Sequence, residues 1–378
     1  MKALLIAVAV LALMGAGMVF LKLPPPAIIV APETVFHAPG LDITNTMFTS
    51  WVVVALLVAM AWFAGRGVRL VPSGFSAYVE AAVMAFYGIV EQVAGPVNAR
   101  RFFPLVGTIF FFILISNYFG LLPMNAVIGV TEPEHGEVQA VFHQTEIAGV
   151  ELAYLPLKTD TRDTAAGEHT LLPEGYEGAH HDAPADAEQS ETHEAETHAA
   201  ERTTDGRFSG ILAPYFRSVM TDINAPLAIA IFAFVFVEFW GIQSLGMGYL
   251  GKFFAFGALK KGPLGLIDVF VGILELVSEF SRIVSFTFRL FGNIFAGEVL
   301  LLMMTFLVPF VLTDAFYGLE LFVGLIQAFV FAMLTTVFAV TAVTHHGDEH
   351  HDEAHEEHGA HDADHAPVPA GTFAENVR

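Results

Sequence analysis

Long uninterrupted apolar runs are the feature that most constrains how this chain can fold. A helix needs about 20 consecutive apolar residues to cross a hydrocarbon core of ~30 Å. Runs of this length occur at 47–65, 104–126 and 222–244. We predict that each of these three segments crosses a membrane as a helix.

The composition agrees with a membrane protein and excludes several kinds of chemistry. Hydrophobic residues make up 54% of the 378 residues and charged residues only 15%, a balance that water-soluble domains rarely show. The absence of cysteine excludes disulfides, thiolate metal sites and cysteine nucleophiles. The formal charge of -22 comes largely from acidic stretches at 160–205 and 348–364, so it describes these segments rather than the apolar remainder.

Two further apolar segments are long enough to form a helical hairpin. The pattern is helical throughout 264–310, and a break around Pro309 to Asp314 leads into a last apolar segment at 316–344. At about 1.5 Å per residue the first helix is much longer than a bilayer requires, so it must tilt, bend or protrude. We therefore predict an all-α integral membrane protein with five or six membrane helices, including this long tilted hairpin.

The N-terminal segment 1–23 allows two interpretations. An apolar run at 3–21 follows Lys2 and precedes Pro24, Pro25 and Pro26. This arrangement fits a cleaved signal peptide or an uncleaved additional span, and we slightly favour the signal peptide.

Basic residues in two connections indicate the orientation in the membrane. Short cytoplasmic loops carry an excess of Lys and Arg, so we expect both connections to be cytoplasmic. This places 127–221 outside the cytoplasm and the C-terminal tail inside. The basic residues are Arg66, Arg69, Arg100 and Arg101 in the first connection and Lys252, Lys260 and Lys261 in the second.

The first of these connections contains a helical apolar pattern opposite two carboxylates, Glu80 and Glu91. We predict an amphipathic helix lying in the membrane interface, with an ordinary soluble helix as the alternative. The apolar positions are Val79, Val83, Phe86, Val90 and Val93.

The acidic, histidine-rich stretches divide the chain into segments. We expect an outer insert and a C-terminal tail to be largely disordered, because His, Asp, Glu and Ala bury too little apolar surface to fold alone. Histidine tracts can bind zinc, but without regular spacing they predict no metal site, and no cofactor is expected. The expected segments are 1–23, the first membrane helices at 40–126, the insert at 127–212, a channel-forming domain at 213–345 and the tail at 346–378.

Two arginines within a proposed span need an explanation. Of the 17 Lys and Arg residues, only Arg282 and Arg289 fall in an apolar span, where an arginine costs at least ~2.5 kcal/mol. Glu279 lies three positions before Arg282 and can pair with it locally. Arg289 has no obligatory carboxylate partner on its own helix, and we expect that anion on another subunit.

Helical spacing places several polar groups around Arg289. At about 100° per residue, Arg282, Arg289 and Asn293 share one face, with Glu275 close to it and Glu298 on the opposite side.

Small residues and a second helix add to this arrangement. Gly292 and Gly297 allow another helix to approach closely. Glu320 and Gln327 lie nearly on one face of 316–344, so polar groups of the two helices could line a wet path.

The segment around Arg289 resembles a known family. Phe288–Glu298 reads Phe-Arg-Leu-Phe-Gly-Asn-Ile-Phe-Ala-Gly-Glu, which is similar to the signature of the a subunit of F-type ATP synthases. Asn117–Pro123, Thr221–Asn224 and Ile326–Phe331 support the resemblance, which covers roughly 40–126 and 213–345.

The resemblance implies a stator subunit that forms two offset half-channels and couples proton flow to rotation and ATP synthesis. It has no catalytic chemistry of its own. The implied partners are the rotor ring of c subunits and the peripheral stalk b subunits, in a bacterial plasma membrane with the tail in the cytoplasm. The sequence leaves the coupling ion open between H⁺ and Na⁺, and we take H⁺ as the default.

Residue by residue, the resemblance implies that Arg289 is the essential rotor-facing arginine. Asn293 and Gln327 match polar positions near it. The other matching positions are Glu298 and Glu320 in the outer half-channel, Glu275 and Ser285 in the inner one, and Asp222 and Asn224 near the outer entrance.

Two rival functions and one open residue remain from the sequence. A stand-alone secondary transporter would be expected to place ligands inside the spans and to show internal repeats, and neither is evident. A passive channel would be expected to carry rings of like charge. Glu238, inside 222–244, could line a channel or extend to the cytoplasmic surface.

Overall fold

The structure is a computed structural model, and its regular elements are mostly helices. The helices are α1 (Lys2–Phe20), α2 (Asn45–Arg66), α3 (Phe75–Gly120), α4 (Asn224–Leu245), α5 (Pro263–Leu307) and α6 (Val311–Val343), with a short 3-10 helix, η1 (Val219–Thr221). The described residues are 2–20, 28–38, 41–66, 74–122, 128–132, 138–147, 150–156, 159–163, 166–173, 201–246, 248–249, 253, 263–308 and 311–344.

Membrane-length apolar helices occur where the sequence predicts them. Within the described residues, five helices are long and apolar enough to cross a membrane: α2, α3, α4, α5 and α6. The predicted span at 104–126 ends earlier, because α3 stops at Gly120. The predicted break before 316 is also shorter, since α6 begins at Val311. Asp314 lies in the first turn of α6, where a carboxylate interacts favourably with the helix dipole.

The α3 helix consists of two parts that meet at Gly95. Gly95 has φ 74° and ψ 162°, which only glycine adopts easily, and Pro96 follows it. The first part contains the predicted amphipathic helix, and its Phe86 ring stacks on Phe110 of the second part with centroids 4.0 Å apart. Phe86 and Val90 are buried and Glu80 is exposed. The position of this helix in a membrane interface stays a prediction.

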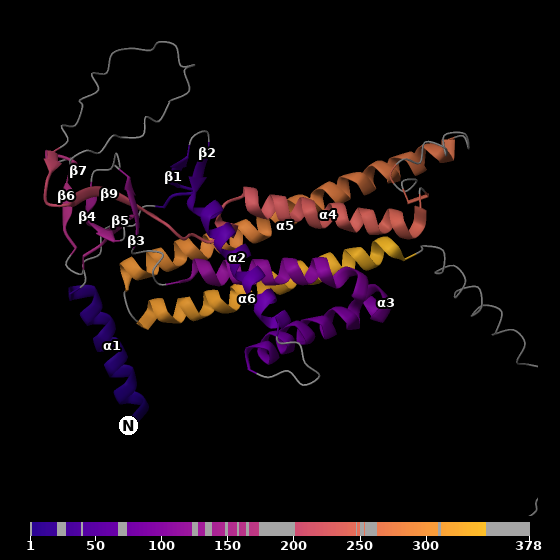
Figure 1. Ribbon diagram of the computed structural model, residues 1–378, viewed down its shortest axis with the longest axis horizontal. Helices are drawn as coiled ribbons and strands as arrows, with labels where there is room; N and C mark the ends of the chain where they lie inside the picture. The colour runs from indigo at the N-terminus through magenta and orange to yellow at the C-terminus, as the bar shows by residue number, and fades with distance from the viewer. Residues whose placement is uncertain are drawn as a thin grey trace, which may run out of the picture.

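Close packing of α3 against α6 organises the helical core (Figure 1). Asn117 Nδ2 donates a hydrogen bond of 3.2 Å to the carbonyl of Gly324, and a Cβ at position 324 would lie 3.2 Å from Asn117 Cβ. Tyr317 donates from its hydroxyl to the carbonyl of Leu121. Small residues on α6 therefore allow the two backbones to approach.

Strands gather at the end of the bundle where α3 finishes and α4 begins (Figure 1). One antiparallel sheet has the order β5-β3-β9-β4-β6, β7 pairs parallel with β8, and β1 forms a hairpin with β2. The strands are β1 (Thr34–Ala38), β2 (Leu41–Thr44), β3 (Ile128–Glu132), β4 (Val138–Ile147), β5 (Val150–Tyr154), β6 (Thr161–Asp163), β7 (Leu171–Pro173), β8 (Glu201–Thr203) and β9 (Arg207–Pro214).

The prediction that the insert 127–212 is largely disordered is therefore wrong for its described part. Phe142 of β4 and Phe208 of β9 are paired across the sheet and both are buried, and Leu171 of β7 is buried as well, so this region has an apolar core of its own. Beneath it, Ser209 Oγ donates to Gln139 Oε1 at 2.8 Å and accepts from the Leu171 amide at 2.7 Å. The acidic stretch at 160–205 dominates the composition of the insert, so composition alone does not reveal these strands.

Several sequence-based expectations fall outside the described residues. These are the disorder of the insert at 174–200, the disorder of the tail at 345–378, and the positions of Arg69, Lys252, Lys260, Lys261 and Pro309. The structure gives α1 as a helix, which fits a signal peptide and an uncleaved span equally, so both interpretations stay predictions.

The sheet predicts a large effect of one core substitution. Phe208 is 0% exposed, so Phe208→Ala should destabilise the sheet by ~3–5 kcal/mol through lost burial and a cavity. Amide hydrogen exchange of β4 and β9 in the full-length protein should become faster.

Val138→Ala is the matched control, because Val138 is 41% exposed on β4 and should change stability by only ~0.5 kcal/mol. Rapid exchange of both strands in the unaltered protein would contradict a folded insert.

Candidate functional site

The two membrane arginines of α5 have different surroundings. Arg282 Nη1 lies 2.5 Å from Glu279 Oε2, and its Cζ lies 3.7 Å from the centre of the Phe338 ring. The predicted local pairing of Glu279 with Arg282 is confirmed. Arg282 is thus held by its own helix and by α6.

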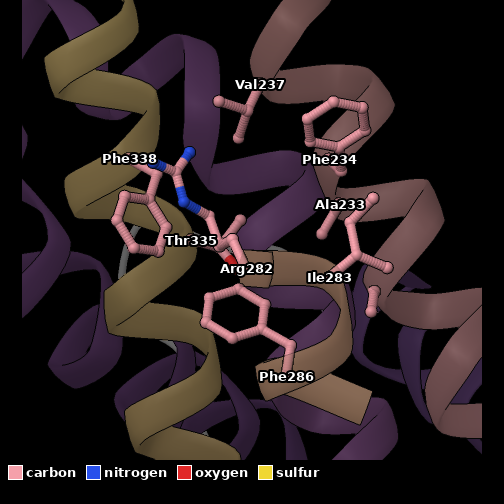
Figure 2. Close-up of a pocket in the computed structure, with 9 residues that line it drawn as sticks. Ala233, Phe234, Val237, Arg282, Ile283, Phe286, Thr335 and Phe338 are labelled. Atoms are coloured by element: carbon pink, nitrogen blue, oxygen red, sulfur yellow. The ribbon is translucent and has the colours of Figure 1, made fainter. Parts of the chain in front are cut away.

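A small pocket surrounds the Arg282 side chain. Figure 2 shows Arg282 between Ala233, Phe234 and Val237 of α4 and Phe338 of α6. The pocket has a volume of ≈ 10 Å³, about enough for one water molecule. It belongs to the packing of α4, α5 and α6 rather than to an open channel.

Tyr249 is a neighbour of Glu238 that sequence analysis missed. Burial raises the pKa of the Tyr249 hydroxyl above its ordinary value of 10, and the charge of Glu238 and a hydrogen bond with it act in the same direction. A Cβ at position 241 would overlap the Tyr249 ring, so Gly241 makes room for it on α4. Glu238 is therefore engaged inside the protein, which favours neither of the two predicted roles.

Arg289 lacks the local partners that hold Arg282. In the part of the chain that the structure describes, no hydrogen bond or ion pair involves Arg289. Its Cζ lies 5.8 Å from the centre of the Phe286 ring, and its side chain is half-buried. The expectation that Arg289 has no carboxylate partner on its own helix agrees with this geometry.

An open face of α5 runs beside Arg289. It consists of residues one helical turn apart that are exposed or half-buried, and most of them are small. Phe288 is 57% exposed, and a Cβ at position 292 would meet nothing within 4 Å. The open face is formed by Ser278, Ser281, Ser285, Phe288, Gly292 and Ala296.

An amide pair connects α5 with α6 one turn from Arg289. Asn293 Nδ2 donates to Gln327 Oε1 at 3.2 Å. Gln327 is 5% exposed, and among the described residues its Nε2 has no hydrogen-bond partner. A buried donor without a partner is costly, so this nitrogen can receive a water or a ligand oxygen.

Gly297 and Glu320 meet where the two hairpin helices approach. A Cβ at position 297 would overlap the Glu320 carboxylate, and Glu320 is 7% exposed. The close approach that Gly297 permits is therefore to α6 of the same chain, whereas Gly292 remains open.

Glu298 forms an ion pair that the sequence analysis did not predict. Arg217 Nε lies 3.1 Å from Glu298 Oε1, and Arg217 Nη2 lies 3.2 Å from Glu298 Oε2. Arg217 lies just before the predicted span at 222–244. Its closeness to that span is the sequence signal that could have singled it out, since helical spacing does not connect it with Glu298. Glu298 and Arg289 lie on opposite sides of α5, so Glu298 pairs with Arg217 and not with Arg289.

Asp222 connects the beginnings of α2 and α4. Its Oδ1 accepts hydrogen bonds of 3.0 Å from the backbone amide and the side-chain amide of Asn224. Its Oδ2 accepts one of 3.2 Å from Thr46 Oγ1. The structure thus brings Asp222 and Asn224 together as a surface-accessible pair.

Three buried polar atoms without partners lie at the same end of the bundle. Within the described ranges they are Ser116 Oγ, Asn117 Oδ1 and Ser218 Oγ. Ser218 packs against Gly120, where a Cβ would overlap it, and Asn117 contacts Gly324, one turn from Glu320. Such orphaned groups mark positions where ordered water can bind.

The two residues assigned to the inner side lie on the other half of α5. Ser285 is exposed and Glu275 is half-buried. Along the helix axis they precede Arg289 by about 6 Å and 21 Å at 1.5 Å per residue. In the described part of the chain, Ser285 forms no hydrogen bond with the other predicted site residues.

Comparisons with known proteins agree on one family. The sequence matches the family model described as "ATP synthase A chain" over residues 47–339. It is 26% identical to an ATP synthase subunit a of Gloeobacter violaceus over 306 residues, covering 81% of this chain and 86% of the relative. It is 23% identical to an ATP synthase subunit a of Moorella thermoacetica over 318 residues, covering 84% and 99%.

The contact between Gly297 and Glu320 predicts a position-specific effect of alanine. Gly297→Ala should destabilise the hairpin by ~1–3 kcal/mol, because the new methyl must displace the Glu320 carboxylate. The thermal unfolding midpoint of the purified protein in detergent should fall.

Gly318→Ala is the control, since a Cβ at position 318 meets nothing within 4 Å and alanine favours a helix by ~1 kcal/mol. Equal midpoints for the two variants would mean that α5 and α6 do not meet at Gly297.

Proposed function

The chain belongs to the ATP synthase A chain family and is a membrane-sector subunit of an F-type ATP synthase, and we propose that it carries protons past a rotor through two half-channels that meet at Arg289. The chain is not catalytic by itself; it is a component of the complex that makes ATP.

The surroundings of Arg289 carry this proposal. An arginine in hydrocarbon costs at least ~2.5 kcal/mol unless a partner or water compensates it. Arg282 has that partner in Glu279, whereas the described residues provide none for Arg289. The open face beside Arg289 leaves room for a helix of another subunit, and a carboxylate on that helix would complete the pair.

The charge of Arg289 determines what such a carboxylate does. A carboxyl group in lipid stays neutral because its charged form loses hydration, whereas an opposite charge within a few ångströms favours the ionised form. The guanidinium remains protonated at any working pH, so Arg289 does not itself relay protons. A rotor carboxyl group arriving at Arg289 therefore releases its proton and must regain one before it re-enters the lipid.

Polar groups at the strand-bearing end support an outer half-channel. Its entrance would be formed by Asp222 and Asn224, which are accessible at the surface. The orphaned Ser116, Asn117 and Ser218 atoms provide sites for water between the entrance and the hairpin. From there the path would continue along Glu298, Glu320, Gln327 and Asn293 to the rotor.

The other half of α5 would form the inner half-channel. Ser285 lies one turn before Arg289, and Glu275 lies farther toward the beginning of α5. The basic residues of the connections between spans support a cytoplasmic location of this end, following the positive-inside rule. The membrane would then be the bacterial plasma membrane, with the C-terminal tail in the cytoplasm.

The offset of the two half-channels converts proton flow into rotation. A proton that enters by one half-channel can leave by the other only after the rotor has carried it around. Each charge that crosses the potential provides ~2.3 kcal/mol per 100 mV. The partners would be a rotor ring of c subunits on the open face and the b subunits of a peripheral stalk, with H⁺ as the coupling ion.

The central prediction concerns proton pumping by the assembled complex. Inverted membrane vesicles that contain the unaltered chain should acidify on addition of ATP, as measured with a pH-sensitive dye. Arg289→Ala should abolish this acidification while leaving the amount of assembled complex unchanged, because the rotor carboxylate loses its counter-charge.

Arg66→Ala is the matched control, because Arg66 stacks on Trp62 with its Cζ 3.6 Å from the ring centre at the end of α2. It should retain pumping. Full pumping by an assembled Arg289→Ala complex would show that Arg289 is not the rotor-facing charge.

A further inference from the structure

Arg217 occupies an unusual position for a charged residue. It lies between β9 and η1, and its side chain is only 6% exposed. Its backbone amide donates a hydrogen bond of 3.1 Å to Thr49 Oγ1 of α2. The residue is therefore fixed where the insert returns to the helical bundle.

The guanidinium of Arg217 connects two distant parts of the chain. On one side it donates to both oxygens of Glu298, with Nε at 3.1 Å and 3.3 Å and Nη2 at 3.2 Å. On the other side, Nη2 donates to the carbonyl of Ile29 at 2.7 Å and Nη1 to the carbonyl of Ala31 at 3.1 Å. One side chain thus holds a carboxylate of α5 and the backbone before β1.

The two members of the ion pair differ in exposure. The side chain of Glu298 is 40% exposed, compared with 6% for Arg217. A buried guanidinium that loses its carboxylate is left with an uncompensated charge, so Arg217 strongly favours one orientation of Glu298. The exposed side of Glu298 remains available to water or to another group.

We propose that Arg217 is a positioning residue for proton transfer at Glu298, and that its bonds to Ile29 and Ala31 hold the segment 28–33 as part of the wall of the outer half-channel. This inference rests on the proposed function, because it requires Glu298 to lie on the proton path. Arg217 acts through Glu298 and is not itself a proton carrier, since its guanidinium stays charged.

A purely structural role makes a different prediction. If Arg217 served only to join the insert to the bundle, its loss would weaken the protein equally whether or not Glu298 is present. If it acts through Glu298, its loss should matter little once Glu298 has been replaced, because residues that share one interaction are not additive.

The test is a double-mutant cycle in membrane vesicles in which the complete complex has assembled. The soluble ATPase part is then stripped from the vesicles, which opens the membrane sector to passive proton flow. Arg217→Gln and Glu298→Gln should each lower the proton conductance by about tenfold, as expected for loss of a charged hydrogen-bonded pair. The double variant should conduct as well as Glu298→Gln alone. A lower conductance of the double variant, near the product of the two losses, would overturn the inference.

If Arg217→Gln fails to assemble, Arg217→Lys replaces it as the variant that is compared with the unaltered chain. Lysine retains the charge but lacks the planar fork of donors, so it should restore part of the conductance and not the bonds to Ile29 and Ala31. Amide hydrogen exchange of 28–33 should then be faster than in the unaltered complex. Unchanged exchange together with unchanged conductance would contradict the role of Arg217.

Failure of this inference can be told from failure of the proposed function. Full conductance of Glu298→Gln would remove Glu298 from the proton path and would thereby contradict the outer half-channel itself. A tenfold loss in Glu298→Gln with full conductance in Arg217→Gln would leave the proposed function intact and reject only the positioning role.

Discussion

The cost of placing a cation in a membrane is the constraint on which the arrangement of α5 and its neighbours depends. Two arginines of α5 face that cost in different ways. Arg282 is neutralised within the chain by Glu279 and covered by the Phe338 ring. Arg289, for which the described ranges contain no ion-pair partner, lies beside an open face. Since an uncompensated charge in lipid is unstable, the proposed function assigns the missing carboxylate to another subunit.

Helix packing positions the polar groups around this charge. Glycine at position 297 lets α5 approach α6 until the Glu320 carboxylate fills the space of a missing side chain. The same crossing brings Asn293 within hydrogen-bonding distance of Gln327. At the strand-bearing end, Arg217 orients Glu298 and connects it to the segment before β1. The segment 28–33 and the connection from β9 to η1 therefore help to shape the proposed outer half-channel.

The apolar runs predicted the membrane helices well, because hydrophobic length alone decides whether a helix can cross a bilayer. Local ion pairing of Glu279 with Arg282 was also predictable, since it depends only on helical spacing. Arg217 could not be predicted, because its contact with Glu298 joins residues 81 positions apart. The sheet of the insert could not be predicted from composition, because the acidic stretch at 160–205 describes only part of 127–212 and most of the strands lie outside it. The roles of the remaining site residues stay predictions.

Cross-linking from the open face of α5 tests most directly whether another subunit supplies the missing carboxylate. The chain has no cysteine, so a single cysteine can be placed at Gly292 or, as a buried control, at Ala339, which is 0% exposed. In membranes treated with a maleimide that carries a photoreactive benzophenone, the single thiol forms a thioether and illumination inserts the benzophenone into a nearby C–H bond. Gly292→Cys should then form an adduct with a small membrane subunit, and Ala339→Cys should not. Two results would contradict the account. One is an adduct of Gly292→Cys only with a second copy of this chain, and the other is labelling of Gly292→Cys by lipid-soluble reagents without any adduct to a protein.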